Sequence, residues 1–284
     1  MKNIIMKYYN FSSIDDYKII RNKFYFEVEG DKYIFEPVYN VEEFNYIYNI
    51  VVNKCDQILK NIYNSHYTNI NDINYVLIKR TTKFHNILDN IQNTQHYFGN
   101  RSVFDKYGWI NLWQKKLDYY EYQQKHIDNY SYISESFNYY LGMGETSIAY
   151  IRYNISTNNI PLVLSHKRIN DDYYNPLNFI FDYKARDVSG YLKYLFLNNK
   201  YCDFDIDSFL KKINFNRVDF ILLYGRLLFP SFYFDLYDDI INNAINQKKI
   251  KSIIIRSDEY EKFLKIIYDK INGIVMIPGI DWLN

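Results

Sequence analysis

The first part of the chain alternates hydrophobic and polar positions, as a strand with one buried face does. Residues 17–38 are rich in aromatic and β-branched side chains and contain the turn Glu29-Gly30-Asp31, a pattern that predicts a β-hairpin closed by Pro37. Apolar residues then recur at helical spacing from residue 41, the segment 63–72 is polar, and residues 75–78 predict another strand. Three strands and one helix are therefore expected to form a small N-terminal lobe.

The second part of the chain has mostly helical periodicity. A helix is predicted from Asp105, which can cap it, to Tyr120, and a second helix over about 133–154. Gly142-x-Gly144 lies inside the second helix with no strand before it, which favours a close helix–helix contact over a phosphate-binding loop. Further helices are expected from Asp187 onward and at 207–214, 217–228, 232–247 and 258–271, and the apolar tail 277–284 is expected to pack down.

Two short apolar runs between these helices dominate the interpretation. Residues 162–164 lead to His166 in a polar loop, and residues 179–181 lead to Asp182. A strand, a loop, a second strand and an acid are typical of the catalytic hairpin of kinases, in which the loop holds the base and the acid holds Mg²⁺. We therefore predict an α+β, bilobal protein-kinase-like fold, with a small strand-rich lobe over 1–80 and a larger, mainly helical lobe over 81–284.

The first half of this hairpin departs from what phosphoryl transfer requires. The loop reads His166-Lys167-Arg168, so a guanidinium, which stays protonated, stands where the base carboxylate is needed. An asparagine for a second metal is expected about five residues further on, where the chain has Asp172-Tyr173-Tyr174. Asn175 or Asn178 would replace it only in a rearranged loop. No catalytic residue is therefore assigned in this loop, and His166 is interpreted as a hydrogen-bonded loop residue.

Other parts of a phosphoryl-transfer site are also missing from the pattern. The predicted strand 32–38 has its only lysine at its start and carries Glu36 in its interior. Glu43 could serve as a helix partner, but a first-turn glutamate favoured by the helix dipole explains it as well. Asp182 stands at a strand end and is the candidate metal ligand. Its structural alternative is to cap the following turn or to pair with Lys184 or Arg186.

Composition excludes several other classes of protein. Lys and Arg number 34 against 33 Asp and Glu, so the net charge of +1 gives no basic field for nucleic acid. Cys55 and Cys202 stand alone, which fits a reducing compartment. There is no signal-peptide pattern and no 18-residue apolar run, so a cytoplasmic protein without membrane insertion is expected. The histidines lack metal-ligand spacing.

Four stretches resemble a known family. They are SHKRI with NPLNFIFDYKARDVSGYLKYL (165–195), YYLGMGETSIAYI (139–151), LLYGRLLFPSFYFD (222–235) and IPGIDWL (277–283). They look like the spore-coat-associated kinase-like proteins of the CotS/YutH group, which are similar in fold to aminoglycoside phosphotransferases and choline kinases. The resemblance implies a kinase-like fold with Asp182 at the metal-binding position and Arg168 at the position of the base. It also implies a role at the developing endospore coat, from the mother-cell cytoplasm.

Three hypotheses follow. The first is a degenerate kinase-like protein, a pseudokinase, that acts by binding a spore-coat or cytosolic protein and needs no cofactor. The second is an atypical small-molecule phosphotransferase that uses ATP and Mg²⁺, with Asp182 as metal ligand and Asp171 or Asp172 as a relocated base. The third is a protein that binds another ligand in the old interlobe cleft.

Overall fold

The computed structural model describes residues 1–20, 22–80, 87–99, 108–124, 130–155, 160–169, 174–242 and 245–283. The chain forms two compact units. The first unit comprises Met1–His96 together with Leu164–Ile180, and the second comprises Tyr97–Val163 together with Phe181–Asn284. The loop of the predicted catalytic hairpin therefore belongs to the same unit as the N-terminal sheet.

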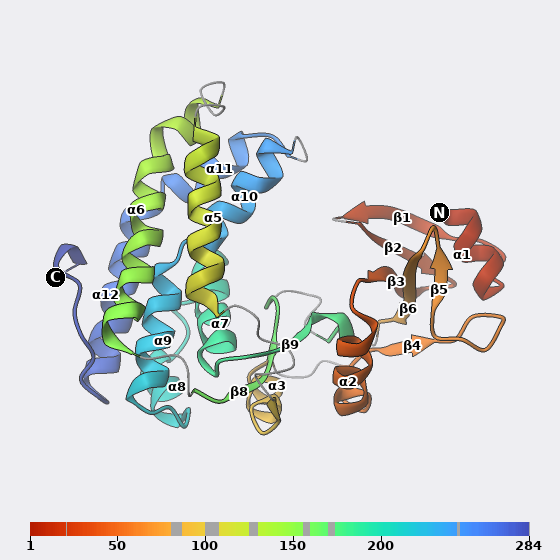
Figure 1. The fold of residues 1–284 in the computed structure, drawn as a ribbon, viewed down its shortest axis with the longest axis horizontal. Coiled ribbons are helices and arrows are strands. Elements are labelled where there is room, and N and C mark those ends of the chain that lie inside the picture. Colours follow the sequence, from red (N-terminus) through yellow and green to blue (C-terminus); the bar gives the residue numbers. More distant parts are fainter. Residues whose placement is uncertain are drawn as a thin grey trace. The chain divides into compact units, whose positions relative to one another are not determined.

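The first unit is built on an antiparallel sheet of six strands with the order β1-β2-β3-β6-β4, in which β5 also pairs with β6 (Figure 1). Its strands are β1 (Asp15–Ile20), β2 (Lys23–Val28), β3 (Asp31–Val38), β4 (Gln57–Leu59), β5 (Thr68–Ile70) and β6 (Ile73–Lys79). The tight turn between β2 and β3 is the predicted one, with Glu29 and Gly30 at φ of 52° and 84°. Both values lie in the left-handed region that such hairpin turns need.

Each face of this sheet is covered by a helix. Helix α1 (Lys2–Tyr9) places Ile5 in one core with Phe26, Tyr33 and Phe35. The opposite face packs against helix α2 (Val41–Val51) in a second core. Alternate residues of β3 serve the two cores, because successive side chains of a strand point to opposite faces.

The sequence correctly predicted strands and a helix in the N-terminal part, but not their number or all of their bounds. Residues 17–38 form three strands instead of two, because the chain also turns just before β2, where Asn22 has φ of 62°. Helix α1 was missed, and β5 lies within the predicted loop 63–72. Strands of three residues, such as β4 and β5, are too short for a period of two to be recognised in the sequence.

The described part of the second unit is mainly helical (Figure 1). Its helices are α5 (Trp109–Gln123), α6 (Ser131–Asn154), α7 (Ala185–Leu197), α8 (Ile206–Lys212), α9 (Arg217–Leu228), α10 (Ser231–Ile241), α11 (Lys248–Ile254), α12 (Ser257–Asn272) and the short 3₁₀ helix η3 (Asp281–Leu283). Helix α9 is the central one and packs against α6, α7 and α12. Among described helices, none is both long and apolar enough to cross a membrane.

Small residues on α6 and α9 allow close helix packing. A Cβ on Gly144 would lie 3.1 Å from Leu117 of α5, which confirms the predicted helix–helix contact for this glycine, whereas Gly142 faces open space. A Cβ on Gly225 would lie 2.5 Å from Ile151 of α6, so α9 and α6 cross at a distance that only glycine permits. Ser147 Oγ donates a hydrogen bond to the Gly225 carbonyl there (2.7 Å).

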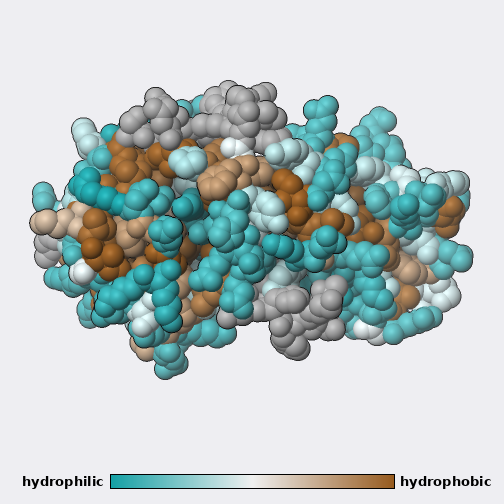
Figure 2. Space-filling view, turned by 90° about the horizontal axis from the view of Figure 1, so that it is seen from below, coloured by the Kyte–Doolittle hydropathy of each residue, from teal (hydrophilic) through white to brown (hydrophobic). Residues whose placement is uncertain are grey.

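Two helix boundaries differ from the predictions. The predicted helix 232–247 is too long, because α10 ends at Ile241, and helix α11 begins only at Lys248, after the predicted range. Helix α7 begins at Ala185 with Lys184 as its N-cap, two residues before the predicted start at Asp187. Asp105, which was predicted to cap the helix that contains Tyr120, lies outside the described residues. On the face drawn in Figure 2, hydrophobic and hydrophilic residues are interspersed.

The two predicted hairpin strands are confirmed as β8 (Leu162–His166) and β9 (Phe179–Asp182). With β7 (Phe98–Gly99) they form a three-stranded sheet of order β7-β8-β9. The 3₁₀ helix η2 (Pro176–Asn178) directly precedes β9. The tail also packs as predicted, since Ile277 and Ile280 are buried and Tyr150 donates a hydrogen bond to the Pro278 carbonyl (3.0 Å).

Candidate functional site

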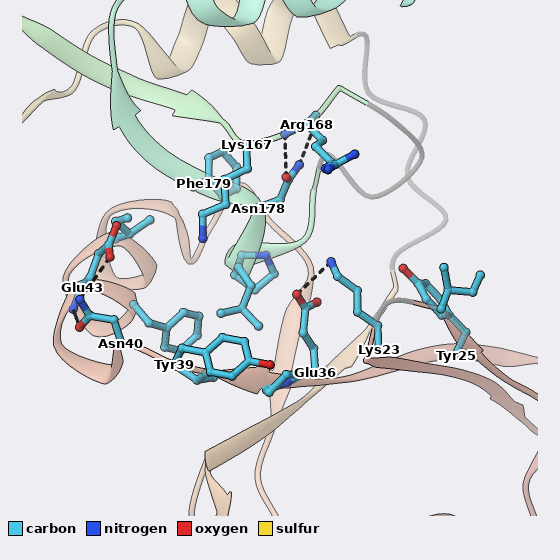
Figure 3. A pocket seen from close by; sticks show the side chains of 17 residues that line it. Lys23, Tyr25, Glu36, Tyr39, Asn40, Glu43, Lys167, Arg168, Asn178 and Phe179 are labelled. Atoms are coloured by element: carbon cyan, nitrogen blue, oxygen red, sulfur yellow. Dashed lines mark hydrogen bonds and ion pairs between the residues drawn. The ribbon is translucent and has the colours of Figure 1, made fainter. Parts of the chain in front are cut away.

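The first unit contains a hollow of about 550 Å³ (Figure 3). Three segments line it: the β1–β2 turn region, the β3–α2 corner, and the loop on both sides of η2. The charged residues of the lining are Lys23, Glu36, Glu43, Lys167 and Arg168. We call this hollow the loop pocket, and all of its lining residues belong to the first unit.

Glu36 holds the polar centre of the loop pocket. It lies in the interior of β3, on the face that carries Ile34 and Val38 toward α2. Lys23 Nζ lies 2.9 Å from Glu36 Oε1, and Asn175 Nδ2 donates to Glu36 Oε2 (2.6 Å). Both oxygens of this largely buried carboxylate are therefore engaged, one by a cation from β2 and the other by an amide from the loop.

The pairing of β2 with β3 explains why Lys23 reaches Glu36. Phe24 pairs with Phe35 in the antiparallel ladder, so Lys23 and Glu36 are the next residues on each strand. Directly opposite side chains in such a ladder lie close enough to interact. Sequence reasoning missed Lys23, because it treated 17–38 as one hairpin; the register of the three-stranded arrangement would have given the pair.

Asn178 organises the loop that carries Lys167 and Arg168. Its side chain accepts a hydrogen bond from Arg168 N (3.0 Å) and donates one to Arg168 O (2.8 Å), and its carbonyl accepts from Lys167 N (2.6 Å). These bonds fix the backbone of both basic residues at the rim of the loop pocket (Figure 3). The amide of Asn178 is thus used to shape the loop.

Asn175 and Glu43 have local structural partners as well. Asn175 Oδ1 accepts from Leu177 N (2.8 Å) and so caps η2, while its amide group binds Glu36. Glu43 lies in the first turn of α2 and is bonded to the N-cap residue Asn40 through its backbone N (3.1 Å) and its carboxylate (3.3 Å). Such contacts are those of a helix start.

His166 ends β8 and is 1% exposed. Its Nε2 lies 3.2 Å from Asn90 Nδ2 of helix α3 (Ile87–Thr94), and its ring packs against Phe179 with a centroid distance of 4.7 Å. A buried imidazole with an amide partner and an aromatic neighbour is placed for packing.

Asp182 lies in the second unit, where Arg186 and Tyr183 engage its carboxylate. Arg186 Nη1 is hydrogen-bonded to Oδ2, and Tyr183 N donates to Oδ1 (2.7 Å). The Asp182 and Arg186 side chains are only 8% and 17% exposed. Of the two structural alternatives weighed from the sequence, capping the following turn and pairing with Arg186, the geometry contains the pairing with Arg186.

A second guanidinium belongs to the same region. Arg226 of α9 lies 4.2 Å from the centroid of the Trp109 ring and 5.7 Å from that of Trp113. Burial, with repulsion from Arg186, lowers the pKa of Arg226 to about 9, while Asp182 and Asp187 oppose this shift. The carboxylate of Asp182 is therefore part of a charge network between α7 and α9.

The structure brings only some of the predicted site residues together. Lys167 and Arg168 line the loop pocket with Glu36, whereas Asp182 is not among the lining residues. Asp171 and Asp172 lie outside the described residues. In the described ranges, no group of three or more His, Cys, Asp or Glu side chains is arranged to hold a metal ion.

Comparison with solved structures defines the class of protein. An aminoglycoside phosphotransferase from Alicyclobacillus acidocaldarius aligns with 96% of this chain and 97% of its own at a TM-score of 0.63 and 11% identity. The spectinomycin phosphotransferase APH(9)-Ia, in complex with ADP and spectinomycin, aligns at a TM-score of 0.55 and 11% identity, over 95% and 97% of the two chains. The chain thus has the fold of these kinases, an N-terminal antiparallel sheet followed by a mainly helical part, as predicted.

The family is identified by sequence. Residues 2–267 match the model of the family described as Spore coat putative kinase YutH, so the chain belongs to this family. The Endospore coat-associated protein YutH of Bacillus subtilis (strain 168) is 26% identical over an alignment of 209 positions, and the match covers 62% of this chain. The match spans 61% of that relative's length. The resemblance inferred from the four motifs is confirmed.

Proposed function

We propose that this chain is a kinase-fold protein that acts by binding a protein partner at the developing spore coat and transfers no phosphoryl group. The observation that carries this proposal is Glu36. A phosphoryl-transfer site needs a lysine in the interior of this strand to neutralise the phosphates, and here the interior residue is a carboxylate already held by Lys23 and Asn175.

The donors that Mg²⁺ and a triphosphate require fit the described residues poorly. Magnesium takes oxygen ligands in octahedral geometry, but Arg186 and Tyr183 engage the Asp182 carboxylate. The Asn178 amide is bonded to the Arg168 backbone, and the Asn175 side chain is bonded to Glu36 and Leu177. Arg168 stands at the position of the base and cannot accept a proton at neutral pH.

The coat location rests on the family relationship. The Bacillus subtilis relative is named an endospore coat-associated protein, and we propose the same association for this chain, from the cytoplasm. A coat protein is then the proposed partner. The chain matches only about three fifths of that relative's length. The proposed coat association therefore concerns the part that the two proteins share.

A second candidate function is an atypical small-molecule phosphotransferase. Lys23 favours it, because this lysine lies in the same hollow as Lys167 and Arg168 and could take over the role of a strand lysine from the neighbouring strand. That reaction would need Asp182 to exchange Arg186 for Mg²⁺, and it would need a base outside the described residues, with Asp171 and Asp172 as candidates.

Thermal unfolding with and without millimolar Mg²⁺-ATP, together with an assay for phosphate release, tests the proposal. A ligand at about 100 times its Kd stabilises a protein by roughly 2.7 kcal/mol. We expect no shift in the midpoint for the wild type or for Asp182→Ala, and no phosphate release. A shift in the wild type that disappears in Asp182→Ala, accompanied by phosphate release, would establish the second candidate instead.

A further inference from the structure

We propose that Asn272 and Gly273 form a latent deamidation site that stays unreactive while the tail (277–283) is docked. In the sequence an asparagine is followed by a glycine at this one place. Asn272 is the last residue of α12, and Gly273 follows it. The reaction needs water and no cofactor. This inference concerns a covalent modification of the chain and is independent of the proposed binding function.

The chemistry follows from the two residue types. The peptide nitrogen of Gly273 attacks Cγ of Asn272 and closes a five-membered succinimide ring. A bond from this nitrogen to Cγ forms, the Cγ–Nδ2 bond breaks, and the Gly273 amide proton leaves, through solvent, with the departing ammonia. Water then opens the ring at either carbonyl, which gives aspartate or isoaspartate at position 272. Glycine favours the attack because it has no side chain to shield the nitrogen.

The folded structure engages both reacting groups elsewhere. Gly273 N donates a hydrogen bond to Asp269 O (3.0 Å), as in the last turn of a helix. Asn272 Oδ1 accepts a hydrogen bond from Ile277 N (2.9 Å). The nitrogen and the side-chain amide can therefore meet only after these two bonds have opened. Such an opening is a local unfolding event with a free energy of its own.

The backbone at Gly273 does not require a glycine. Its φ of −67° and ψ of −13° lie in the right-handed region that other residues adopt freely. A Cβ there would lie 3.4 Å from Lys270 O, which is an ordinary van der Waals contact. Many helices end on a glycine with left-handed backbone, but that reason does not apply here. The property of glycine that matters at this position is its unshielded peptide nitrogen.

Docking of the tail controls the opening. Ile277 and Ile280 are buried, and Tyr150 of α6 donates a hydrogen bond to Pro278 O (3.0 Å). The bond from Ile277 N to Asn272 lasts only while this segment is in place. Removing the two isoleucines from the core costs the free energy of their burial. The stability of the docked tail therefore limits how often Asn272 is released to react.

The modification would make undocking of the tail permanent. Isoaspartate adds one carbon to the main chain at position 272, so the helical bond of Gly273 N and the bond of Ile277 N cannot both re-form. Aspartate keeps an acceptor for Ile277 N, but it places a negative charge at the C-terminal end of α12, which the helix dipole disfavours. A transient opening is thus converted into lasting exposure of the tail.

Peptide mapping by mass spectrometry tests the inference on the full chain, incubated at mildly alkaline pH. We expect aspartate and isoaspartate to form at position 272 at least about tenfold more slowly in the folded chain than in the same chain in urea, because the reaction needs an opening. Gly273→Ala should react severalfold more slowly in urea, since the added methyl group shields the nitrogen. Asn272→Gln marks the background of the assay.

Variants of the tail then test its control of the reaction. Ile277→Asp should accelerate modification at least about tenfold, because a carboxylate in place of a buried isoleucine undocks the tail. Met276→Asp is the matched control: it makes the same substitution one residue earlier, where the side chain is 81% exposed, and should leave the rate unchanged. Tyr150→Phe removes the hydroxyl that binds Pro278 O and should accelerate modification severalfold.

Equal rates in the folded and the urea-unfolded chain would overturn the inference. Equal acceleration by Ile277→Asp and Met276→Asp would overturn it as well, because the effect would then come from the new charge and not from the tail. No acceleration by Ile277→Asp and Tyr150→Phe would show that the tail does not control the reaction. Unfolding midpoints identify any variant that is globally unfolded, and Tyr150→Phe decides if Ile277→Asp is one of them.

Discussion

Lys23 of β2 and Glu36 of β3 form an ion pair, with Lys23 Nζ 2.9 Å from Glu36 Oε1. Both residues line the loop pocket, together with Lys167 and Arg168. In an active kinase the strand contributes the lysine and a helix contributes the glutamate. Here the strand contributes the carboxylate and its neighbouring strand contributes the ammonium group. The structure thus contains a lysine–glutamate ion pair between two strands instead of between a strand and a helix, and Asn175 of the loop joins it.

The first prediction concerns this ion pair. Glu36→Ala should destabilise the protein by about 1–3 kcal/mol, because Lys23 and the Asn175 amide lose their partner in a largely buried place. Lys23→Ala should cost less, since its side chain is 27% exposed and that of Glu36 is 11% exposed. Urea unfolding of both single variants and of the double variant gives the coupling energy. Strictly additive effects would show that the two side chains do not interact.

The second prediction concerns Asp182. Asp182→Ala should cost about 3–5 kcal/mol, because it leaves the Arg186 guanidinium buried without its carboxylate. Lys211 and Asp207 provide a more exposed control pair with the same sequence spacing, since their side chains are 58% and 35% exposed. Asp207→Ala should change stability by no more than about 1 kcal/mol. Similar costs for the two substitutions, measured by chemical unfolding, would contradict the role of burial.

The third prediction concerns the crossing of α6 and α9. Gly225→Ala should destabilise by about 1–3 kcal/mol, because the new Cβ would meet Ile151 at 2.5 Å. The cost should be smaller in an Ile151→Ala background, where space is available. Gly142→Ala on α6 is the control: nothing lies within 4 Å of its Cβ position, so it should stabilise by about 0.5–1 kcal/mol. Thermal unfolding of these variants measures the effects.

The fourth prediction concerns alkaline pH. Burial raises the pKa of Tyr233 to about 12, and it raises the pKa values of Tyr150, Tyr224 and Tyr260 above the usual 10. Above pH 10 these groups stay protonated in the folded protein and ionise in the unfolded one. The folded state then binds more protons, so stability is fully present below pH 10 and falls as pH rises. Each such tyrosine contributes a slope of about 1.4 kcal/mol per pH unit.

Two readouts check this pH dependence. The unfolding midpoint should drop steadily above pH 10, and the tyrosinate absorbance of these four buried rings should appear together with unfolding instead of before it. Gradual ionisation of all tyrosines without unfolding would show that the buried rings are accessible to water.

The strands and helices that bear the site could largely be predicted from the sequence, because their periodicity is local. The hairpin strands β8 and β9 and helix α9 were found on that basis, with α9 at its observed bounds of 217–228. The loop pocket could not be found, since it depends on the register that sets Lys23 opposite Glu36 and on the rearranged loop that brings Asn175 to the sheet. Neither contact has a signal at short sequence separation.

The Asp182–Arg186 pair has a consequence for the chemical environment in which the protein can work. A bound magnesium ion exchanges with the other chelators and phosphate compounds in the cell, and it dissociates when the free concentration of magnesium falls. The counter-ion of Asp182 is part of the same chain, four residues away on the first turn of α7, and dilution or chelation cannot remove it. The charge of Asp182 should therefore stay balanced under dilution or chelation that would remove the bound ion from a metal-binding protein.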